Sequence, residues 1–432
     1  MISTDVDKKL KVLFVSYTFP PNPYGGTYRA MRACKGLNEL GVEVHVLTTK
    51  PYNDPLNDYS LLEKIPGDIK IHRTRFYDPW RRYQKLRKPF MHFRWFKYLD
   101  RIISLLLWVF TVPDRMVLWI PFAISMGLRI IKQEGIKNVL VSSPPDSSQF
   151  IGYVLKRFAH AHFIADFRDP IVGNIAEVRL VDPKDLRSKI EKKIKKLFEH
   201  LIVRSADKII TNTETHRKEL TSAYRLNNVI TVRNSFDKDE YKGLNEKKYD
   251  IFTISHLGNM YGLRKVDVLF EALKLFKAFK QPDPLNVQIL FVGNNSPELI
   301  QSAKSYGIEK YIKVHKTVPH RDALEIMMRS HLLLLVKATG KGSHGQIPGK
   351  FYEYLGSGNK ILHIGPEASE VASIISDFDT GYTVESDSNK LFEILKNKYD
   401  LFNSSVSDQT DTKSINQFSY KNLAKKIHEL FI

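Results

Sequence analysis

The chain has 432 residues, of which 43% are hydrophobic and 26% charged, so intrinsic disorder, collagen-like repeats and small disulfide scaffolds are excluded. Its length suits two or three domains. The formal net charge of +19 predicts a polyanion, an anionic membrane or a phosphorylated substrate as partner. Because Cys34 is the single cysteine and the N-terminal segment lacks the apolar stretch of a secretory signal, we expect a cytoplasmic protein.

The first half of the chain alternates strands with helices. Residues 11–17 (KVLFVSY) read as a buried strand, followed by a turn containing Gly25 and Gly26, a helix ending at Gly41 and a second strand at 42–48. This order is typical of the βαβ unit of a parallel sheet. Further strands are predicted at residues 137–143, 162–167, 207–212 and 229–233.

A polar segment, residues 237–249, lacks an apolar period and is interpreted as a linker. A second α/β series follows, with strands at 251–255, 287–292, 332–336 and 360–363, a helix at 266–280, a polar loop at 404–414 and a last helix at 420–431. The predicted domains are residues 1–236 and 250–414, with a helical segment, 415–432, that can pack back on the first domain. We therefore predict two Rossmann-like, doubly wound α/β domains facing a central cleft, where ligands belong.

Glycines between a strand and a helix mark candidate anion sites. Gly25 and Gly26 occupy such a turn, although an ordinary tight turn explains them equally well. In the second domain, Gly258 opens a loop that carries Arg264 and Lys265, two cations suited to a diphosphate. Solvated surface charges are the alternative for that pair.

The segment 342–358 (GSHGQIPGKFYEYLGSG) follows a very apolar strand and opens a short helix. Lys350 is predicted in its first turn and Glu353 one turn later. This arrangement offers backbone N–H groups and a cation to phosphate, and a carboxylate to sugar hydroxyls. Alternatively, Glu353 is an exposed helix carboxylate.

These segments resemble the family 4 glycosyltransferases over most of the chain, through the sequences FPPNPYGG, GNMYGLRK, IPGKFYEYLGSG and FSYKNLAKKI. The resemblance implies the GT-B fold and transfer of a sugar from a nucleotide donor with retention of configuration. It also implies that Gly25 and Gly26 lie near the donor diphosphate, that Lys265 is its cationic partner and that Glu353 binds the nucleotide ribose.

Two positions depart from the family pattern. Gly345 stands where the family often has a first glutamate, and Asn259 replaces the basic residue that often follows the loop glycine. Pro348 and Lys350 resemble a branch of the family that acts in surface polysaccharide assembly.

In the first domain, SSPPDSS and ADFRDP fall at predicted strand ends, which places Asp146, Arg168 and Asp169 at the cleft. Arg168 stands where many relatives have a histidine, so the acceptor side is expected to differ. A local ion pair between Arg168 and Asp169 is the alternative.

Residues 81–101 carry eight lysines or arginines and one aspartate among several aromatic residues, and the apolar stretch 102–112 follows. Eleven residues are too few to span a bilayer, which needs roughly 20. The segment suits an interfacial element on anionic lipid, or else an ordinary helix with one face in the core. In the basic stretch 187–196, a stripe formed by Ile190, Ile194, Leu197 and Leu201 is interpreted as core.

The combined hypothesis is a retaining glycosyltransferase, cytoplasmic and peripherally bound to the inner face of the membrane, that acts in cell-surface polysaccharide biosynthesis. Its partners are a nucleotide-sugar donor, a glycan or polyprenyl-diphosphate-linked acceptor and an anionic membrane surface. No metal or other cofactor is expected, because cations can stabilise the departing diphosphate. The candidate catalytic residues are Lys265, Arg264, Arg168 and Asp169, and the donor-binding residues are Gly25, Gly26, Gly258, Lys350 and Glu353.

Two alternatives remain open. A nucleotide-sugar epimerase has the same two-domain architecture, since fold alone does not fix chemistry. A basic nucleic-acid-binding protein is disfavoured, because the sequence lacks zinc-ligand spacing, an RNP-like aromatic motif and a helix-turn-helix, so no nucleic-acid partner is expected.

Overall fold

The computed structural model describes residues 9–23, 25–51, 57–173, 186–260, 266–280, 285–293, 297–337, 343–404, 410 and 414–432. The chain forms two compact units: unit 1 comprises Met1–Arg233 and Leu423–Ile432, and unit 2 comprises Asn234–Asn422. Among the described helices, none combines the length and the apolarity that crossing a membrane requires.

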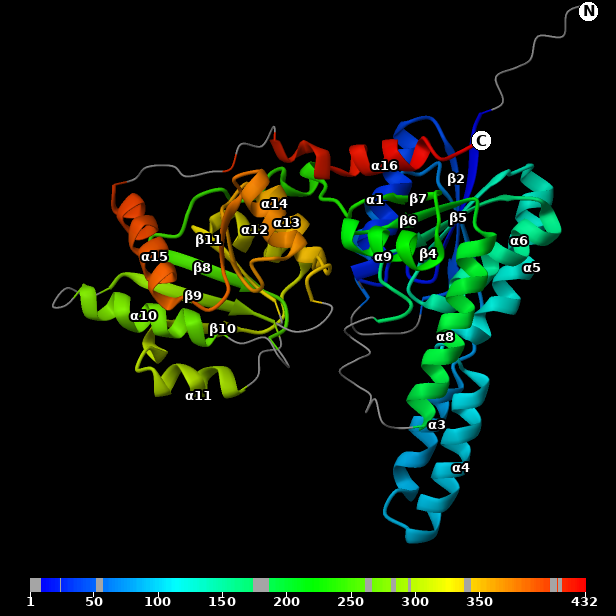
Figure 1. The fold of residues 1–432 in the computed structure, drawn as a ribbon, viewed down its shortest axis with the longest axis horizontal. Helices are drawn as coiled ribbons and strands as arrows, with labels where there is room; N and C mark the ends of the chain where they lie inside the picture. The colour runs from blue at the N-terminus through cyan, green and yellow to red at the C-terminus, as the bar shows by residue number, and fades with distance from the viewer. Residues whose placement is uncertain are drawn as a thin grey trace, which may run out of the picture. The chain divides into compact units, whose positions relative to one another are not determined.

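Unit 1 is built on a seven-stranded parallel sheet with the order β3-β2-β1-β4-β5-β6-β7 (Figure 1). The direction of winding reverses between β1 and β4, and ligands bind beside such a switch point in doubly wound sheets. The strands are β1 (Lys11–Ser16), β2 (Glu43–Thr49), β3 (Lys70–Thr74), β4 (Asn138–Ser143), β5 (His162–Phe167), β6 (Lys208–Thr211) and β7 (Val229–Thr231).

Side chains of these strands alternate between two apolar cores, one on each face of the sheet. Leu13 and Val15 of β1 belong to the core that also contains Trp119, and Val12 and Phe14 belong to the other. The helices and short 3-10 turns around the sheet are α1 (Gly25–Glu39), α2 (Ser60–Glu63), η2 (Val117–Trp119), α5 (Ile120–Glu134), η3 (Asp146–Ser148), α6 (Gln149–Ala159) and α9 (Glu214–Tyr224).

The C-terminal helix α16 (Tyr420–His428) contributes to unit 1. Its residues Leu423, Ala424 and Ile427 are buried in the second of the two cores. The chain end is held by Asn138, whose Nδ2 donates to the Ile432 carbonyl at 3.1 Å and whose Oδ1 accepts from the Ile432 N–H at 3.0 Å. The last ten residues therefore pack beside strands that are far away in sequence.

Unit 2 contains a six-stranded parallel sheet with the order β10-β9-β8-β11-β12-β13. Its strands are β8 (Phe252–Leu257), β9 (Val287–Val292), β10 (Ile312–His315), β11 (Leu332–Val336), β12 (Ile361–Ile364) and β13 (Gly381–Val384). The helices and 3-10 turns are η4 (Lys238–Tyr241), α10 (Asp267–Phe279), α11 (Pro297–Ser305), η5 (Glu309–Tyr311), α12 (His320–Arg329), α13 (Gly349–Ser357), α14 (Glu370–Asp377), α15 (Ser388–Asn403) and η6 (Ser414–Phe418). Both sheets are parallel and both carry helices, so the predicted α/β fold class is confirmed.

The polar segment 237–249 is packed against unit 2, which differs from a free linker. Tyr241 and Leu244 are buried, and the Tyr241 hydroxyl donates to the Glu353 carbonyl at 2.7 Å. The Lys248 ammonium donates to the carbonyls of Met328 and Ser330, both at 2.8 Å. These contacts involve a few residues far away in sequence, which is why an apolar period does not reveal them.

Residues 79–110 of unit 1 form a helical arm, comprising α3 (Pro79–Arg87), η1 (Lys88–Phe90) and α4 (Arg94–Phe110). The Tyr83 hydroxyl and the Arg87 guanidinium both bind Asp100, at 2.7 and 3.2 Å, and join the two helices. Phe96 is the one buried residue of α4, and α3 has none. The interpretation of this segment as a core helix is therefore wrong.

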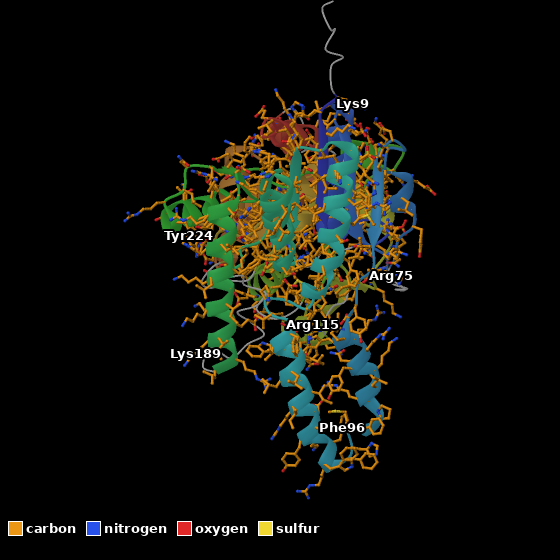
Figure 2. All side chains as sticks on the ribbon, turned by 90° about the vertical axis from the view of Figure 1, so that its right-hand side faces the viewer. Lys9, Arg75, Phe96, Arg115, Lys189 and Tyr224 are labelled. Carbon is orange, nitrogen blue, oxygen red and sulfur yellow. The ribbon has the colours of Figure 1, made fainter. Side chains whose placement is uncertain are left out.

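Helix α8 (Leu186–Ser205) extends from unit 1 in the same direction as the arm (Figure 2). The stripe formed by Ile190, Ile194, Leu197 and Leu201 is exposed, and the predicted assignment of this stripe to the core is wrong. Lys195 and Glu199, on the other side of α8, are buried instead. The Lys195 ammonium lies 3.7 Å from Asp146, and Glu199 accepts from the Tyr224 hydroxyl at 2.7 Å, so charged contacts hold the helix to the unit.

Candidate functional site

In unit 2, the end of β8 meets the start of α13. Gly258 follows β8 with a φ of +108°, a conformation that favours glycine, and Lys350 stands in the first turn of α13. A Cβ at position 258 would lie 2.9 Å from the Lys350 Nζ, so the missing side chain makes room for the ammonium. Lys350 and the positive end of the α13 helix dipole together offer positive charge to an anion.

His256, a fully buried residue of β8, orients the Lys350 ammonium. Its Nδ1 lies 2.9 Å from the Leu334 carbonyl, which can only accept, so we assign the ring hydrogen to Nδ1. The bare Nε2 then accepts from Lys350 Nζ at 3.1 Å. Sequence reasoning missed this histidine, although a histidine inside an apolar strand two residues before the loop glycine was a usable signal.

Glu353 lies one turn beyond Lys350 on α13, with a side chain that is only 15% exposed. Its Oε1 lies 3.2 Å from Nε2 of His320, the first residue of α12. The alternative of an exposed helix carboxylate is therefore wrong. Sequence reasoning also missed His320, which no local pattern connects to Glu353.

Three further hydrogen bonds hold α13 and the loop before it. The Tyr354 hydroxyl accepts from the Leu257 N–H at 2.9 Å, which ties α13 to β8. The Lys337 ammonium donates to the carbonyls of Ser343 at 2.7 Å and Gln346 at 2.6 Å, inside the loop that leads to Pro348. Burial lowers the pKa of Lys337 to about 8, because desolvation disfavours the charged form.

In unit 1, Gly26 at the start of α1 lies against Arg168, which follows β5. A Cβ at position 26 would collide with the Arg168 guanidinium, whereas one at Gly25 would meet open space. The Nη2 of Arg168 lies 3.3 Å from Asp169 Oδ2, so these two residues form the local ion pair that is the alternative interpretation. The structure thus brings Gly26, Arg168 and Asp169 together.

A fully buried ion pair lies beside this group. Arg29 of α1 donates to both carboxylate oxygens of Asp166, at 3.0 and 2.8 Å, and Ser142 of β4 donates to Asp166 at 2.8 Å. These bonds fix α1 to the ends of β4 and β5, and so fix the turn at Gly26. Sequence reasoning overlooked Asp166, although it precedes the selected Arg168 by two residues.

Three further residues were predicted at the site. Asp146 is buried at the end of β4 beside Lys195. Arg264 and Lys265 lie outside the described residues. The contacts of unit 2 therefore involve Gly258, Lys350 and Glu353, and those of unit 1 involve Gly26, Arg168 and Asp169.

Among the described residues, one group could offer three ligand atoms to a metal ion, namely Glu43, His45 and Glu134. The Lys70 ammonium lies 2.8 Å from Glu43 and 3.4 Å from Glu134, and the Lys11 ammonium lies 3.5 and 3.8 Å from the same two residues. Two cations therefore already offset the two carboxylates. Glu43 begins β2, so the group lies at the opposite end of the sheet from Arg168. It therefore has no place in the candidate site.

No protein-family model and no curated protein sequence matches the chain. Solved structures do match it over nearly its whole length. A glycosyltransferase from Rickettsia africae has a TM-score of 0.61 at 13% identity, covering 98% of each chain. A mutant of S. aureus TarM, in complex with fondaparinux, alpha-GlcNAc-glycerol and UDP, has a TM-score of 0.60 at 12% sequence identity. The match covers 98% of this chain and 99% of the TarM chain. The chain has the GT-B glycosyltransferase fold.

Two other structures with this fold bear on the ligand and on the reaction. Anabaena HepE in complex with UDP-glucose has a TM-score of 0.59 at 13% identity, covering 97% of this chain and 98% of its own. A structure described as a UDP-N-acetylglucosamine 2-epimerase from Listeria monocytogenes has a TM-score of 0.56 at 12% sequence identity. The match covers 97% of this chain and 95% of the other. The GT-B fold is therefore compatible with both reactions that the sequence left open.

Proposed function

We propose that the chain is a retaining glycosyltransferase that transfers a sugar from a nucleotide-sugar donor to a glycan or lipid-linked acceptor in cell-surface polysaccharide assembly. The observation that carries the proposal is the group of Lys350, Gly258, His256 and Glu353 at the strand ends of unit 2. It supplies a cation held in place, a glycine that leaves room for that cation, and a carboxylate one helical turn away. Those are the contacts that a nucleoside diphosphate needs.

Lys350 and the α13 N-terminus bind the diphosphate in this proposal. As the glycosidic bond breaks, negative charge grows on the departing phosphate, so a cation fixed by His256 stabilises the transition state more than the bound donor. Arg264 and Lys265 add positive charge from the loop after Gly258. Glu353 accepts hydrogen bonds from the ribose hydroxyls, as the family resemblance implies.

Gly25 and Gly26 are proposed to lie near the donor diphosphate, and Arg168 and Asp169 to serve the reacting sugar and acceptor. The Arg168 guanidinium lies over Gly26 and is held by Asp169, so its position is defined before a substrate binds. A side chain at position 26 would displace it, which is a reason for glycine there.

The arm formed by α3 and α4 is proposed to bind the anionic face of a membrane. Its exposed aromatic residues include Phe90, Phe93, Trp95 and Tyr98, at 43–70% exposure, with exposed lysines and arginines between them. Aromatic rings suit the membrane–water boundary, and each cation near an anionic surface contributes about 1 kcal/mol. Binding there would bring the site to a lipid-linked acceptor.

The test is mass spectrometry and NMR spectroscopy of products from a panel of nucleotide sugars, with and without lipid-linked glycan acceptors. We expect a glycosylated acceptor, an anomeric proton coupling that shows retention, and activity that survives EDTA. Lys350→Met should abolish most product, whereas Lys313→Met, an exposed lysine of β10, should not. If no donor yields a product, or if the Lys350 variant is fully active, the proposal is wrong.

A nucleotide-sugar epimerase is the second candidate, favoured by the match to the structure described as an epimerase. The same panel separates the two functions. An epimerase converts the donor sugar without any acceptor, and proton exchange with solvent at the inverted carbon would reveal it in deuterium oxide. Transfer without epimerisation excludes this candidate.

A further inference from the structure

Helix α8 exposes a stripe of apolar side chains and buries two charged ones, which is the opposite of an ordinary surface helix. Its exposed apolar side chains are Leu186, Ile190, Ile194, Leu197 and Leu201, with exposed fractions between 37% and 69%. At 3.6 residues per turn these five side chains lie within about 80° of one another around the helix. Lys195 and Ile202 point to the opposite side, where they are buried. The apolar stripe therefore faces away from unit 1.

Cations flank this stripe along the helix. Seven lysines or arginines lie on α8 against two glutamates, and all of these cations except Lys195 are exposed: Arg187, Lys189, Lys192, Lys193, Lys196 and Arg204. Long cationic side chains beside an apolar stripe can reach anionic headgroups while the stripe enters the interface. The pattern matches a helix that lies on an anionic bilayer.

The start of α8 contacts the end of the helical arm. The Arg187 guanidinium lies 5.9 Å from the Trp108 ring, which joins the start of α8 to the end of α4. Near that contact α4 exposes Leu105, Val109 and Phe110, at 41%, 55% and 70%. Figure 2 shows both helices extending from the sheet of unit 1 in the same direction, with Lys189 of α8 level with the base of the arm at Arg115.

We propose that α8 is a second membrane contact, which lays its stripe of Leu186, Ile190, Ile194, Leu197 and Leu201 on an anionic bilayer beside α4. The inference rests on the membrane role proposed for the arm. It adds a second contact that would fix the orientation of unit 1 on the membrane surface. One anchored helix leaves rotation about its own axis free, whereas two joined helices define a plane. A second copy of the chain is a poorer occupant, because pairing two α8 helices would oppose cation to cation.

The first experiment replaces Ile190, Ile194, Leu197 and Leu201 by Gln in the full chain, with the arm unchanged. Cosedimentation is measured with phosphatidylcholine vesicles that contain or lack phosphatidylglycerol. We expect the apparent affinity for the anionic vesicles to fall at least about tenfold, since the lost apolar contact is large. The matched control, Leu275→Gln with Phe279→Gln on α10, removes apolar side chains of 40% and 52% exposure and should not change binding.

A labelling experiment covers the case in which the multiple variant does not fold. Ile194→Cys is labelled with an environment-sensitive fluorophore, and Leu275→Cys serves as the control. The native Cys34 is fully buried with a raised pKa, so it should stay unmodified. We expect a blue shift on anionic vesicles at position 194 and none at 275.

Equal vesicle binding by the α8 variant and the wild type, or an Ile194→Cys label without a shift, would overturn the inference. So would a wild-type dimer in sedimentation velocity that the α8 substitutions dissociate without affecting vesicle binding. Transfer to a soluble acceptor is assayed in parallel. Active enzyme with unchanged vesicle binding would refute only the α8 contact, whereas absent transfer would refute the proposed function.

Discussion

Lys350 Nζ lies 3.1 Å from Nε2 of His256, and the imidazole is itself fixed by the Leu334 carbonyl at 2.9 Å from Nδ1. A lysine side chain has four rotatable bonds, so an ammonium in one position requires such a partner. The histidine accepts this hydrogen bond through an uncharged nitrogen, so it adds no negative charge beside the Lys350 ammonium.

We predict that His256→Ala weakens binding of a nucleoside diphosphate about tenfold, because the ammonium loses its orienting acceptor. Lys350→Met should lower kcat/KM about 100-fold or more, the usual effect of removing a donor to developing charge. Isothermal titration and steady-state rates test both. If His256→Ala binds the nucleoside diphosphate with wild-type affinity while Lys350→Met loses activity, Lys350 does not need the hydrogen bond to His256.

For Glu353, we predict that Glu353→Ala lowers nucleotide affinity about tenfold through lost hydrogen bonds to the ribose. The decisive readout is the ratio of affinities for a nucleoside diphosphate and its deoxyribose analogues. The wild type should prefer the ribose form, and the variant should not. His320→Ala should reduce this preference less, because His320 acts only through Glu353. A variant that keeps the full preference would exclude Glu353 from ribose binding.

Lys337 predicts a pH dependence of stability. Its pKa falls from 10.5 to about 8 on folding, so between these pH values the unfolded chain binds more protons than the folded one. Unfolding free energy contributed by this group therefore rises with pH in that window, by at most about 1.4 kcal/mol per pH unit. In urea titrations at several pH values, the free energy of unfolding of the wild type should increase relative to that of Lys337→Met from about pH 8 upward. A constant or falling difference would contradict this.

The buried pair of Arg29 and Asp166 predicts a large loss of stability. Asp166→Asn leaves the buried guanidinium without its counter-charge and should cost about 3–5 kcal/mol. Glu367→Gln breaks a pair of similar length, 2.8 Å to Lys390, in which both side chains are about half exposed, and should cost less than about 1 kcal/mol. Denaturant unfolding compares the two. Equal losses in the free energy of unfolding would mean that burial of an ion pair does not determine how much its disruption destabilises the protein.

For the arm, we predict that changing the exposed Arg82, Lys85 and Lys88 to Gln weakens binding to anionic vesicles about 100-fold, at about 1 kcal/mol for each cation. Arg87 is kept, because its bond to Asp100 joins α3 to α4. A control with equal net charge changes Lys247, Lys274 and Lys304 of unit 2. Turnover of soluble substrates should survive. If both triple variants lose equal affinity, net charge alone is responsible and the arm has no special role.

The sequence by itself determined the α/β class and ten of the strands, because strands buried on both faces, such as LLLLV in β11, are continuously apolar. It missed β3, β10 and β13, which lie at sheet edges and have only one buried residue each. It also placed Gly258 in a loop after a strand and Lys350 and Glu353 on successive turns of one helix, since local patterns of loop and helix mark such positions.

Only the tertiary structure decided which side chains meet. His256 and Lys350 are 94 residues apart, and their contact exists because β8 ends beside the start of α13. The spacing of Ile190, Ile194 and Leu197 determined a helix with one apolar side, but periodicity carries no information about what that side faces. Packing against unit 1 buried Lys195 beside Asp146 and left the apolar side in solvent. A periodic pattern reports the geometry of one element, whereas contacts depend on where the rest of the chain lies.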